Sequence, residues 1–251
     1  MPRYFLELSY KGTAYSGFQI QDTGNTIQAE VKKALQTIFR QPFELTGSSR
    51  TDAGVHAQQN YFHFDTNLEL GNKNCYALNA VLPKDIAIHR IALVANDAHS
   101  RFQAISRSYR YSIHAHKDPF LTDIAWLYPF PLQKDALDEA AAILLEYSNF
   151  TSFSKRNTQV NNFNCQLSRS EWIEKDGLLV YEVTANRFLR GMIRGLVATM
   201  LKTGRGSLSL QGFRDILEAL DCSKADFSAP AHGLCLMQVN YPPSILPILS
   251  F

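Results

Sequence analysis

Eleven residues, Gly47 to Ala57, read GSSRTDAGVHA and concentrate side chains that can do chemistry. They bring together hydroxyls, a guanidinium, a carboxylate and an imidazole between segments whose patterns are typical of strands and helices. The stretch is too long and too polar for a tight hairpin, so it is expected to be a loop that places side chains.

Two interpretations of this stretch need partners that the spacing does not supply. A Ser/His/Asp hydrolase would use Ser48 or Ser49 with Asp52 and His56. No G-x-S-x-G elbow surrounds either serine, and triad members usually converge from distant parts of a chain. Metal binding by Asp52, His56 and His63 lacks a recognised ligand spacing.

Residue types alone leave two further interpretations open. Asp52 and Thr51 could cap nearby backbone N–H groups, with Arg50 and His56 solvated or bonded to carbonyls. Alternatively, Asp52 is a nucleophile. A carboxylate with a reference pKa of about 3.9 is ionised at neutral pH and needs no general base to attack a sugar or base carbon. It would need a cationic neighbour and a closed site.

The elements that must position this loop follow from hydrophobic periodicity and from helix and turn signals. Asn25 is expected to be the N-cap of the first helix, with Gln28 as its reciprocal partner, and Pro42 should stop that helix. The first half then reads β-α-β-β-α-β, with strands at Tyr4–Ser9, Phe43–Leu45, Asn60–Asp65 and Ile86–Val94 and a second helix from Tyr76 that ends at Pro83.

The second half repeats this pattern with one additional helix. Asp176-Gly177 is a strong two-residue hairpin signal between two of its strands. The order is β-α-β-β-α-α-β, with strands from Ser106, at Cys165–Glu174, Leu178–Ala185 and Leu234–Asn240, and helices at Lys134–Tyr147, Arg190–Thr203 and Ser209–Leu220.

Each half matches the split β-α-β, ferredoxin-like (RRM-like) arrangement. The predicted fold class is therefore α+β, with two ferredoxin-like halves, antiparallel sheets and a cleft between the halves. The boundary is expected near Ala95 to His99, which gives an N-terminal half of residues 1–98 and a C-terminal half of residues 99–251.

Composition narrows the class of protein. The 251 residues are 45% hydrophobic, which is enough for a sizeable core. No apolar run is long enough to span a membrane, and the N-terminal residues lack the features of a secretory signal. The four cysteines form no metal-binding or C-x-x-C spacing and are expected to be buried free thiols in a reducing compartment. These features predict a cytoplasmic protein without a membrane partner.

Basic residues are segregated although the net charge is only +2. No acidic residue occurs between Glu182 and Asp215 or between His99 and Lys117, and both stretches contain several arginines and lysines. Such segregation suits a polyanion, although a single basic cluster is more often a solvated surface.

The motif G-x-x-R-T-D-A-G-V-H-A resembles the tRNA pseudouridine synthase A family. The same family pattern fits the stretch from Tyr10 to Gln21 and four further stretches, in register and nearly end to end: NAVLPKD (Asn79–Asp85), HSRFQAISRSYR (His99–Arg110), NFTSF (Asn149–Phe153) and NRFLRGMIR (Asn186–Arg194). The resemblance implies an isomerase that needs no cofactor and no metal. It also implies a homodimer and a tRNA partner, modified at uridines 38 to 40 of the anticodon stem-loop.

The resemblance also assigns roles to four residues. Asp52 is the nucleophile, Tyr109 packs against the target base and Arg194 pairs with the nucleophile from the other half. Arg50 enters the space that the flipped uridine leaves. Thr51, Gly54 and His56 are expected to shape the loop.

The chain departs from the family pattern at two positions. Phe18 stands where the family commonly has Trp, which keeps an aromatic wall. Ser49 stands where it commonly has Gly, which matters only if the backbone needs a positive φ there.

Two alternatives come from other functional classes. A non-catalytic RNA-binding protein of RRM-like halves would predict an RNP1 pattern, which NYFHFDT lacks. A glycoside-type hydrolase would need a second carboxylate near Asp52. Glu44 and Asp65 are the nearest acids in sequence, and neither lies in the loop.

Overall fold

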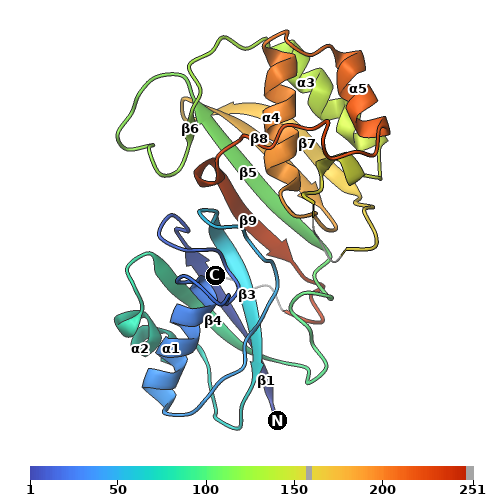
Figure 1. Cartoon of the computed structure of the whole chain (residues 1–251). Coiled ribbons are helices and arrows are strands. Elements are labelled where there is room, and N and C mark those ends of the chain that lie inside the picture. Colours follow the sequence, from blue (N-terminus) through green and yellow to red (C-terminus); the bar gives the residue numbers. More distant parts are fainter. Residues whose placement is uncertain (157–159, 247–251) are drawn as a thin grey trace. The chain divides into compact units, whose positions relative to one another are not determined.

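The chain folds into an α+β structure of two compact units (Figure 1). The structure is a computed structural model and describes residues 1–156 and 160–246. The first unit comprises Met1–Arg107 together with the C-terminal segment from Cys235, and the second comprises Ser108–Leu234. Helices and mostly antiparallel strands confirm the predicted α+β class.

A sheet forms the centre of the first unit, in the order β4-β1-β3-β9 with β2 paired to β3. The β1 strand is antiparallel to both β3 and β4, while β9 runs parallel to β3 at His56 and Ala57. The strands are β1 (Arg3–Tyr10), β2 (Thr46–Gly47), β3 (His56–Asp65), β4 (Ile86–Val94) and β9 (Leu234–Asn240).

Two helices, α1 (Ile27–Phe39) and α2 (Cys75–Val81), cover one face of this sheet (Figure 1). The α1 helix buries Ile27, Val31 and Leu35, as the apolar periodicity predicts. It ends before Pro42, and Leu82 ends α2 before Pro83, so both predicted stops are confirmed. Strand side chains complete the core, including Phe5, Leu6, Leu8, Phe62 and Phe64.

The second unit contains a sheet in the order β5-β8-β7, with β6 parallel to β5. Three helices pack beside one another on it (Figure 1). The strands are β5 (Ser106–His114, which begins at the boundary of the units), β6 (Trp126–Leu127), β7 (Leu167–Lys175) and β8 (Leu178–Ala185), and the helices are α3 (Lys134–Ile143), α4 (Met192–Gly204) and α5 (Leu210–Glu218). Single 3-10 turns lie at Asn72–Asn74, Leu144–Glu146, Thr151–Phe153 and Ala231–Gly233.

The hairpin between β7 and β8 is confirmed. Asp176 and Gly177 have φ of 53° and 76°, the left-handed conformation that a two-residue turn of this type requires at both positions. Asp and Gly adopt this conformation more readily than most residues, which explains the local sequence.

Three local predictions were wrong. The N-cap of α1 is Thr26, whose hydroxyl accepts from the N–H of Ala29, and not Asn25. Gln28 makes no capping box, because its amide donates to the Leu45 carbonyl and accepts from the Ile20 N–H. The short strand predicted at Phe43–Leu45 is instead Thr46–Gly47, and the Leu45 carbonyl accepts the Gln28 amide.

The units differ in extent from the expected halves because β9 pairs with β3. The last strand therefore belongs to the same unit as the first. The four cysteines are free; Cys75 and Cys165 are buried, while Cys222 and Cys235 are only partly buried. Across the described ranges, no helix is both long and apolar enough to cross a bilayer.

Candidate active site

The candidate loop connects the end of β2 at Gly47 to the start of β3 at His56. Its ends are fixed by the sheet, because the Ser48 N–H donates to the Tyr61 carbonyl and His56 pairs with β9. The strand begins four residues earlier than the sequence predicts, so the last residues of the motif are strand and not loop.

A buried hydrogen-bond network holds the middle of the loop. The Tyr10 hydroxyl lies 2.8 Å from Thr51 Oγ1 and accepts from Asn60 Nδ2 at 3.1 Å. The same Asn60 amide donates to the Ser49 carbonyl at 2.9 Å. All four residues are buried, so each of these bonds would be costly to leave unmade. Two residues outside the loop, Tyr10 and Asn60, therefore fix the backbone on the N-terminal side of Asp52.

The segment after β1 covers the loop at very close range. A Cβ atom at Gly12 would lie 2.0 Å from the Val55 carbonyl oxygen, so only glycine fits there. The Gly12 N–H donates to His56 Nδ1 at 3.0 Å, and the Phe18 N–H donates to the Thr51 carbonyl at 3.1 Å. These contacts explain why glycines and a histidine accompany the reactive residue types in sequence.

Asp52 is the first residue of a tight turn and is partly buried. The turn is closed by the backbone, since the Val55 N–H donates to the Asp52 carbonyl and Gly54 has a φ of 79°. Within the described residues of the first unit, no hydrogen bond or ion pair engages the Asp52 carboxylate. The capping interpretation is thus wrong for Asp52, because backbone groups and Thr51 make the turn.

The expectation that Thr51, Gly54 and His56 shape the loop is confirmed by these contacts. The substitution at Ser49 is compatible with the loop, because the non-glycine residues with positive φ in the described ranges are Arg40, Asp176 and Leu220. Phe18 keeps the aromatic wall: it is buried and stacks on Phe62 with ring centroids 4.5 Å apart.

The hydrolase and metal interpretations find little support in this geometry. The hydroxyls of Ser48 and Ser49 lie 3.5 Å from each other, and His56 Nδ1 is occupied by the Gly12 N–H. His63 instead contacts Ser100, with Nδ1 2.8 Å from the hydroxyl oxygen. No group of three or more His, Cys, Asp or Glu side chains gathers in metal-binding geometry anywhere in residues 1–156 and 160–246.

Arg50 is exposed on the same loop and lines a small pocket of the first unit. The pocket has a volume of about 220 Å³ and is also lined by Phe18, His99, Arg101 and Phe102. The loop therefore brings together a carboxylate and a nearby cation, with a hollow beside the cation.

The other two predicted site residues, Tyr109 and Arg194, lie in the second unit. Tyr109 is partly buried on β5, and its ring meets the edge of Phe188 with centroids 5.2 Å apart. Arg194 is in the first turn of α4, where its Nε donates to the Ala229 carbonyl at 2.6 Å. Burial raises the pKa of Tyr111, and the positive charge of Arg194 opposes this rise.

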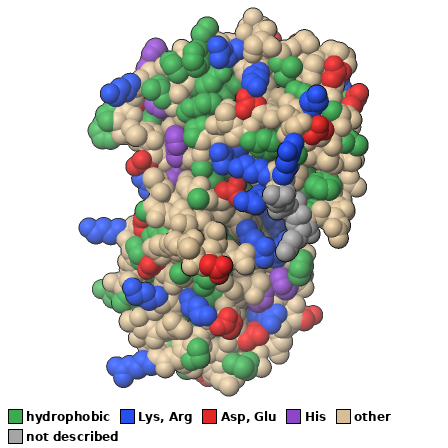
Figure 2. Space-filling view, viewed as in Figure 1, with side chains coloured by type: hydrophobic (Ala, Val, Ile, Leu, Met, Phe, Trp, Pro, Cys, Tyr) green, Lys and Arg blue, Asp and Glu red, His purple; other side chains and the backbone are tan. Residues whose placement is uncertain are grey.

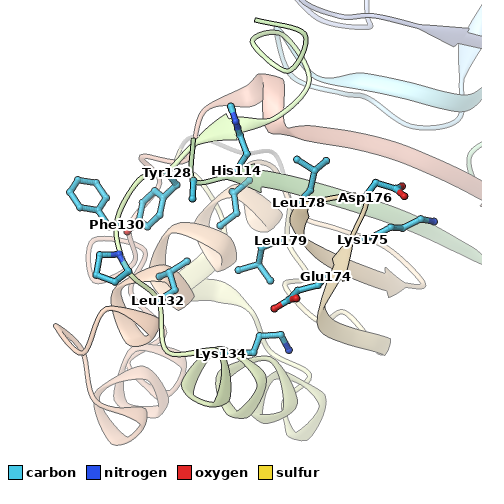
Figure 3. A pocket seen from close by; sticks show the side chains of 14 residues that line it. His114, Tyr128, Phe130, Leu132, Lys134, Glu174, Lys175, Asp176, Leu178 and Leu179 are labelled. Atoms are coloured by element: carbon cyan, nitrogen blue, oxygen red, sulfur yellow. The ribbon is translucent and has the colours of Figure 1, made fainter. Parts of the chain in front are cut away.

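A further hollow of about 510 Å³ lies in the second unit and contains none of the four predicted site residues. Figure 3 shows Tyr128, Phe130 and Leu132 on one side of it and Leu178 and Leu179 facing them. Apolar side chains also gather on the surface of this unit (Figure 2), where Phe120, Ile124, Leu127 and Phe130 are exposed.

Acids that are distant in sequence neutralise part of both basic stretches. Arg110 pairs with Glu182 at 2.8 Å, Lys202 with Asp226 at 2.8 Å and Arg214 with Glu146 at 2.6 Å. Arg205 lies over the Phe130 ring at 4.2 Å. A stretch without acids in sequence is thus not free of acids in space, and fewer cations are available for phosphates than the sequence suggests.

Sequence reasoning missed several residues that support the site. Asp85 accepts the Tyr15 hydroxyl at 2.6 Å, and its carbonyl accepts the Lys11 N–H, which anchors the covering segment just before the start of β4. The signal that could have found Asp85 is its place in NAVLPKD, one of the stretches that fit the family pattern. Tyr10 was noted only as the first residue of the Tyr10–Gln21 stretch and Asn60 only as the start of a strand, because their partners lie 41 and 11 residues away.

Comparison with known proteins agrees with this architecture. The family model described as tRNA pseudouridine synthase matches residues 8–103 and 140–242. The chain is 42% identical over 250 residues to tRNA pseudouridine synthase A of Parabacteroides distasonis, covering 99% of each chain. It is 44% identical over 247 residues to the protein of that name from Porphyromonas gingivalis, covering 96% of this chain and 98% of the relative.

The chain therefore belongs to the tRNA pseudouridine synthase family. It is an isomerase that converts uridine to pseudouridine.

Proposed function

We propose that this enzyme isomerises uridines 38 to 40 in the anticodon stem-loop of tRNA, with Asp52 as the nucleophile and the target nucleotide flipped out of the helix. The observation that carries the proposal is the Asp52 loop. A partly buried carboxylate is on the first residue of a turn, and residues of β1 and β3 hold the backbone just before it.

The overall reaction breaks the bond between uracil N1 and ribose C1′ and forms a bond between C5 and C1′. The hydrogen on C5 leaves as a proton, and N1 gains a proton. An ionised carboxylate can attack without a general base, and its departure in the second step regenerates the enzyme. Attack by Asp52 on the sugar carbon and attack on the base ring are both consistent with these changes in bonds and protons.

Preorganisation of the nucleophile is the contribution that the first unit makes. Hydrogen bonds to Thr51 and Ser49 and the close cover by Gly12 restrict the backbone that carries Asp52. A nucleophile held in one geometry loses less entropy on reaching the transition state, and such positioning is worth up to about 7–11 kcal/mol in well-oriented reactions.

The remaining residues act on the flipped nucleotide. Arg50 takes the space that the uridine leaves, which offsets part of the few kcal/mol that unstacking costs. Tyr109 packs against the base, and Phe188 supports its ring edge to face. Arg194 pairs with Asp52, because a guanidinium can fix the orientation of a carboxylate through two hydrogen bonds, and its Nε also donates to the Ala229 carbonyl.

The proposal extends to the fold and the assembly. The order β4-β1-β3-β2 in the first unit supports a ferredoxin-like arrangement for that unit. We propose a cytoplasmic homodimer that binds the anticodon arm of tRNA. Stem-loops of this kind are read largely by shape and by phosphate contacts.

Release of tritium from uracil C5 tests the nucleophile. In tRNA labelled at C5 of its uridines, the parent enzyme should release tritium, while Asp52→Asn and Asp52→Ala should release none and still bind the RNA. Asp97→Asn is the matched control, because Asp97 is an exposed carboxylate of the same unit.

The assay also separates the alternatives. Normal release by Asp52→Asn would exclude Asp52 as the nucleophile. Binding without release by the parent would favour an RNA-binding protein. Release that persists when uridines 38 to 40 are replaced by cytidines would overturn the proposed position.

A further inference from the structure

A column of aromatic rings runs from the core of the first unit to its surface. Ring centroids lie 6.2 Å apart from Phe5 to His63, 4.6 Å from His63 to His99 and 4.2 Å from His99 to Phe102. Phe102 ends the column and is 74% exposed. An apolar ring of this size is costly to leave in water unless something covers it in use.

The loop that presents Phe102 is held rigid by its own hydrogen bonds. His99 Nδ1 accepts the N–H groups of Arg101 and Phe102, and Gln103 closes a reciprocal pair with the His99 backbone. The guanidinium of Arg107 donates to the carbonyls of Arg101 and Ala104. A ring held this way loses little freedom on binding, which favours affinity.

Burial keeps His99 and His63 uncharged. Desolvation lowers the pKa of His99, and it lowers the pKa of His63 to about 4. Two neutral rings behind Phe102 form a stacking base without a net charge of their own. The positive charge at this surface therefore comes from arginines.

The 220 Å³ pocket lies beside Phe102 and joins it to the reactive loop. Its lining includes Arg50, Arg101 and Gln19, and no described residue that lines it is acidic. The guanidinium carbon of Arg101 lies 5.6 Å from the centroid of the Phe102 ring. A hollow of about 220 Å³ suits one planar ring rather than a folded segment of protein.

Together these features combine a stacking surface with cations, which is the chemistry that binds a single-stranded nucleotide. We infer that Phe102 is the stacking platform for an unpaired nucleotide next to the flipped uridine, with the phosphate of that nucleotide held by Arg101. The inference rests on the proposed function, because Arg50 belongs to both the reactive loop and this pocket. It adds a second nucleotide subsite to the first unit.

The test measures the affinity of an anticodon stem-loop for Phe102 variants in an Asp52→Asn background, where no turnover occurs. Loss of one base stack should weaken binding roughly 5- to 150-fold in Phe102→Ala. Phe102→Trp should bind like the parent. Phe102→Leu should weaken binding almost as much as Phe102→Ala, because leucine keeps apolar volume but has no π-face. Tyr76→Ala is the matched control, since Tyr76 is 85% exposed in the same unit.

A second series locates the nucleotide. Stem-loops that each lack one base of the loop are bound to the Asp52→Asn enzyme with and without Phe102→Ala. The inference predicts that the effect of Phe102→Ala disappears for one of these RNAs and persists for the others. Thermal unfolding of each variant checks the fold, which an exposed side chain should not change.

Several results would overturn the inference. Equal RNA binding by Phe102→Ala and Tyr76→Ala would show that Phe102 does not stack on a base. Unchanged binding by Phe102→Leu would show that the side chain makes only apolar contact with the RNA. A weakened self-association with normal RNA binding would assign the ring to an interface between copies. Tritium release by the parent, measured separately, decides the proposed function, so a failure there is distinguishable from a failure of the Phe102 subsite.

Discussion

The Tyr10 hydroxyl offers the sharpest test of how the loop positions Asp52. It bonds to Thr51, the residue before Asp52, and to Asn60, which in turn holds Ser49. Tyr10→Phe removes one oxygen from a buried network and leaves polar partners with one bond fewer. We expect this to cost about 1–3 kcal/mol, which lowers Tm by roughly 2–12 °C for a chain of this size.

The effect on catalysis should exceed what the loss of stability explains. Contacts of Phe18 and Gly54 with the neighbouring backbone still hold the turn, so the loop loosens without unfolding. A displacement of about 1 Å costs roughly 100-fold in rate, so we expect kcat to fall roughly 10- to 100-fold with little change in KM. Initial rates of tritium release well below Tm measure this effect.

Tyr4→Phe is the matched control. Tyr4 is a buried tyrosine of the same strand, and its hydroxyl donates to the Leu68 carbonyl at 3.0 Å, remote in sequence from the reactive loop. It should lower Tm by a similar amount and leave kcat unchanged. Equal losses of kcat in both variants, or an unchanged kcat in Tyr10→Phe, would refute the argument that the Tyr10 network positions Asp52.

Two further predictions concern the cover of the loop and the effect of pH. Gly12→Ala should abolish tritium release and increase proteolysis of the loop, because the new methyl group would clash with the Val55 carbonyl. Gly71→Ala is the control and should be neutral, because no heavy atom lies within 4 Å of the methyl group that it adds. Normal activity of Gly12→Ala would contradict this prediction. The folded-state pKa of His63, about 4, lies below its unfolded value, so its neutral form stabilises the protein above pH 6.5 and this contribution is lost as pH falls from about 6.5 towards 4. His63→Gln should therefore reduce the pH dependence of the free energy of unfolding in that window by up to about 1.36 kcal/mol per pH unit, measured by urea denaturation, and an identical slope in both proteins would disprove the assignment.

Local patterns predicted the elements of this protein well. The β4 strand occupies Ile86–Val94 as expected, the Asp176-Gly177 turn has the required dihedral angles, and α5 begins one residue after the expected start at Ser209. These features depend on residues only a few positions away, so the local sequence is enough to predict them. The N-cap of α1 was misplaced by one residue because Gln28 bonds to a loop 17 residues away, which no local pattern reports.

The sequence by itself determined the family through the R-T-D-A-G-V-H order and identified Asp52 as the group to test. Only the tertiary structure decided how that carboxylate is held, because Tyr10, Thr51 and Asn60 meet across 50 residues of chain. It also decided which cations remain available, since Lys202, Arg214 and Arg110 are paired with acids from other segments. Hydrogen bonds and ion pairs depend on distances in space, and the fold sets these distances by joining residues that are far apart along the chain.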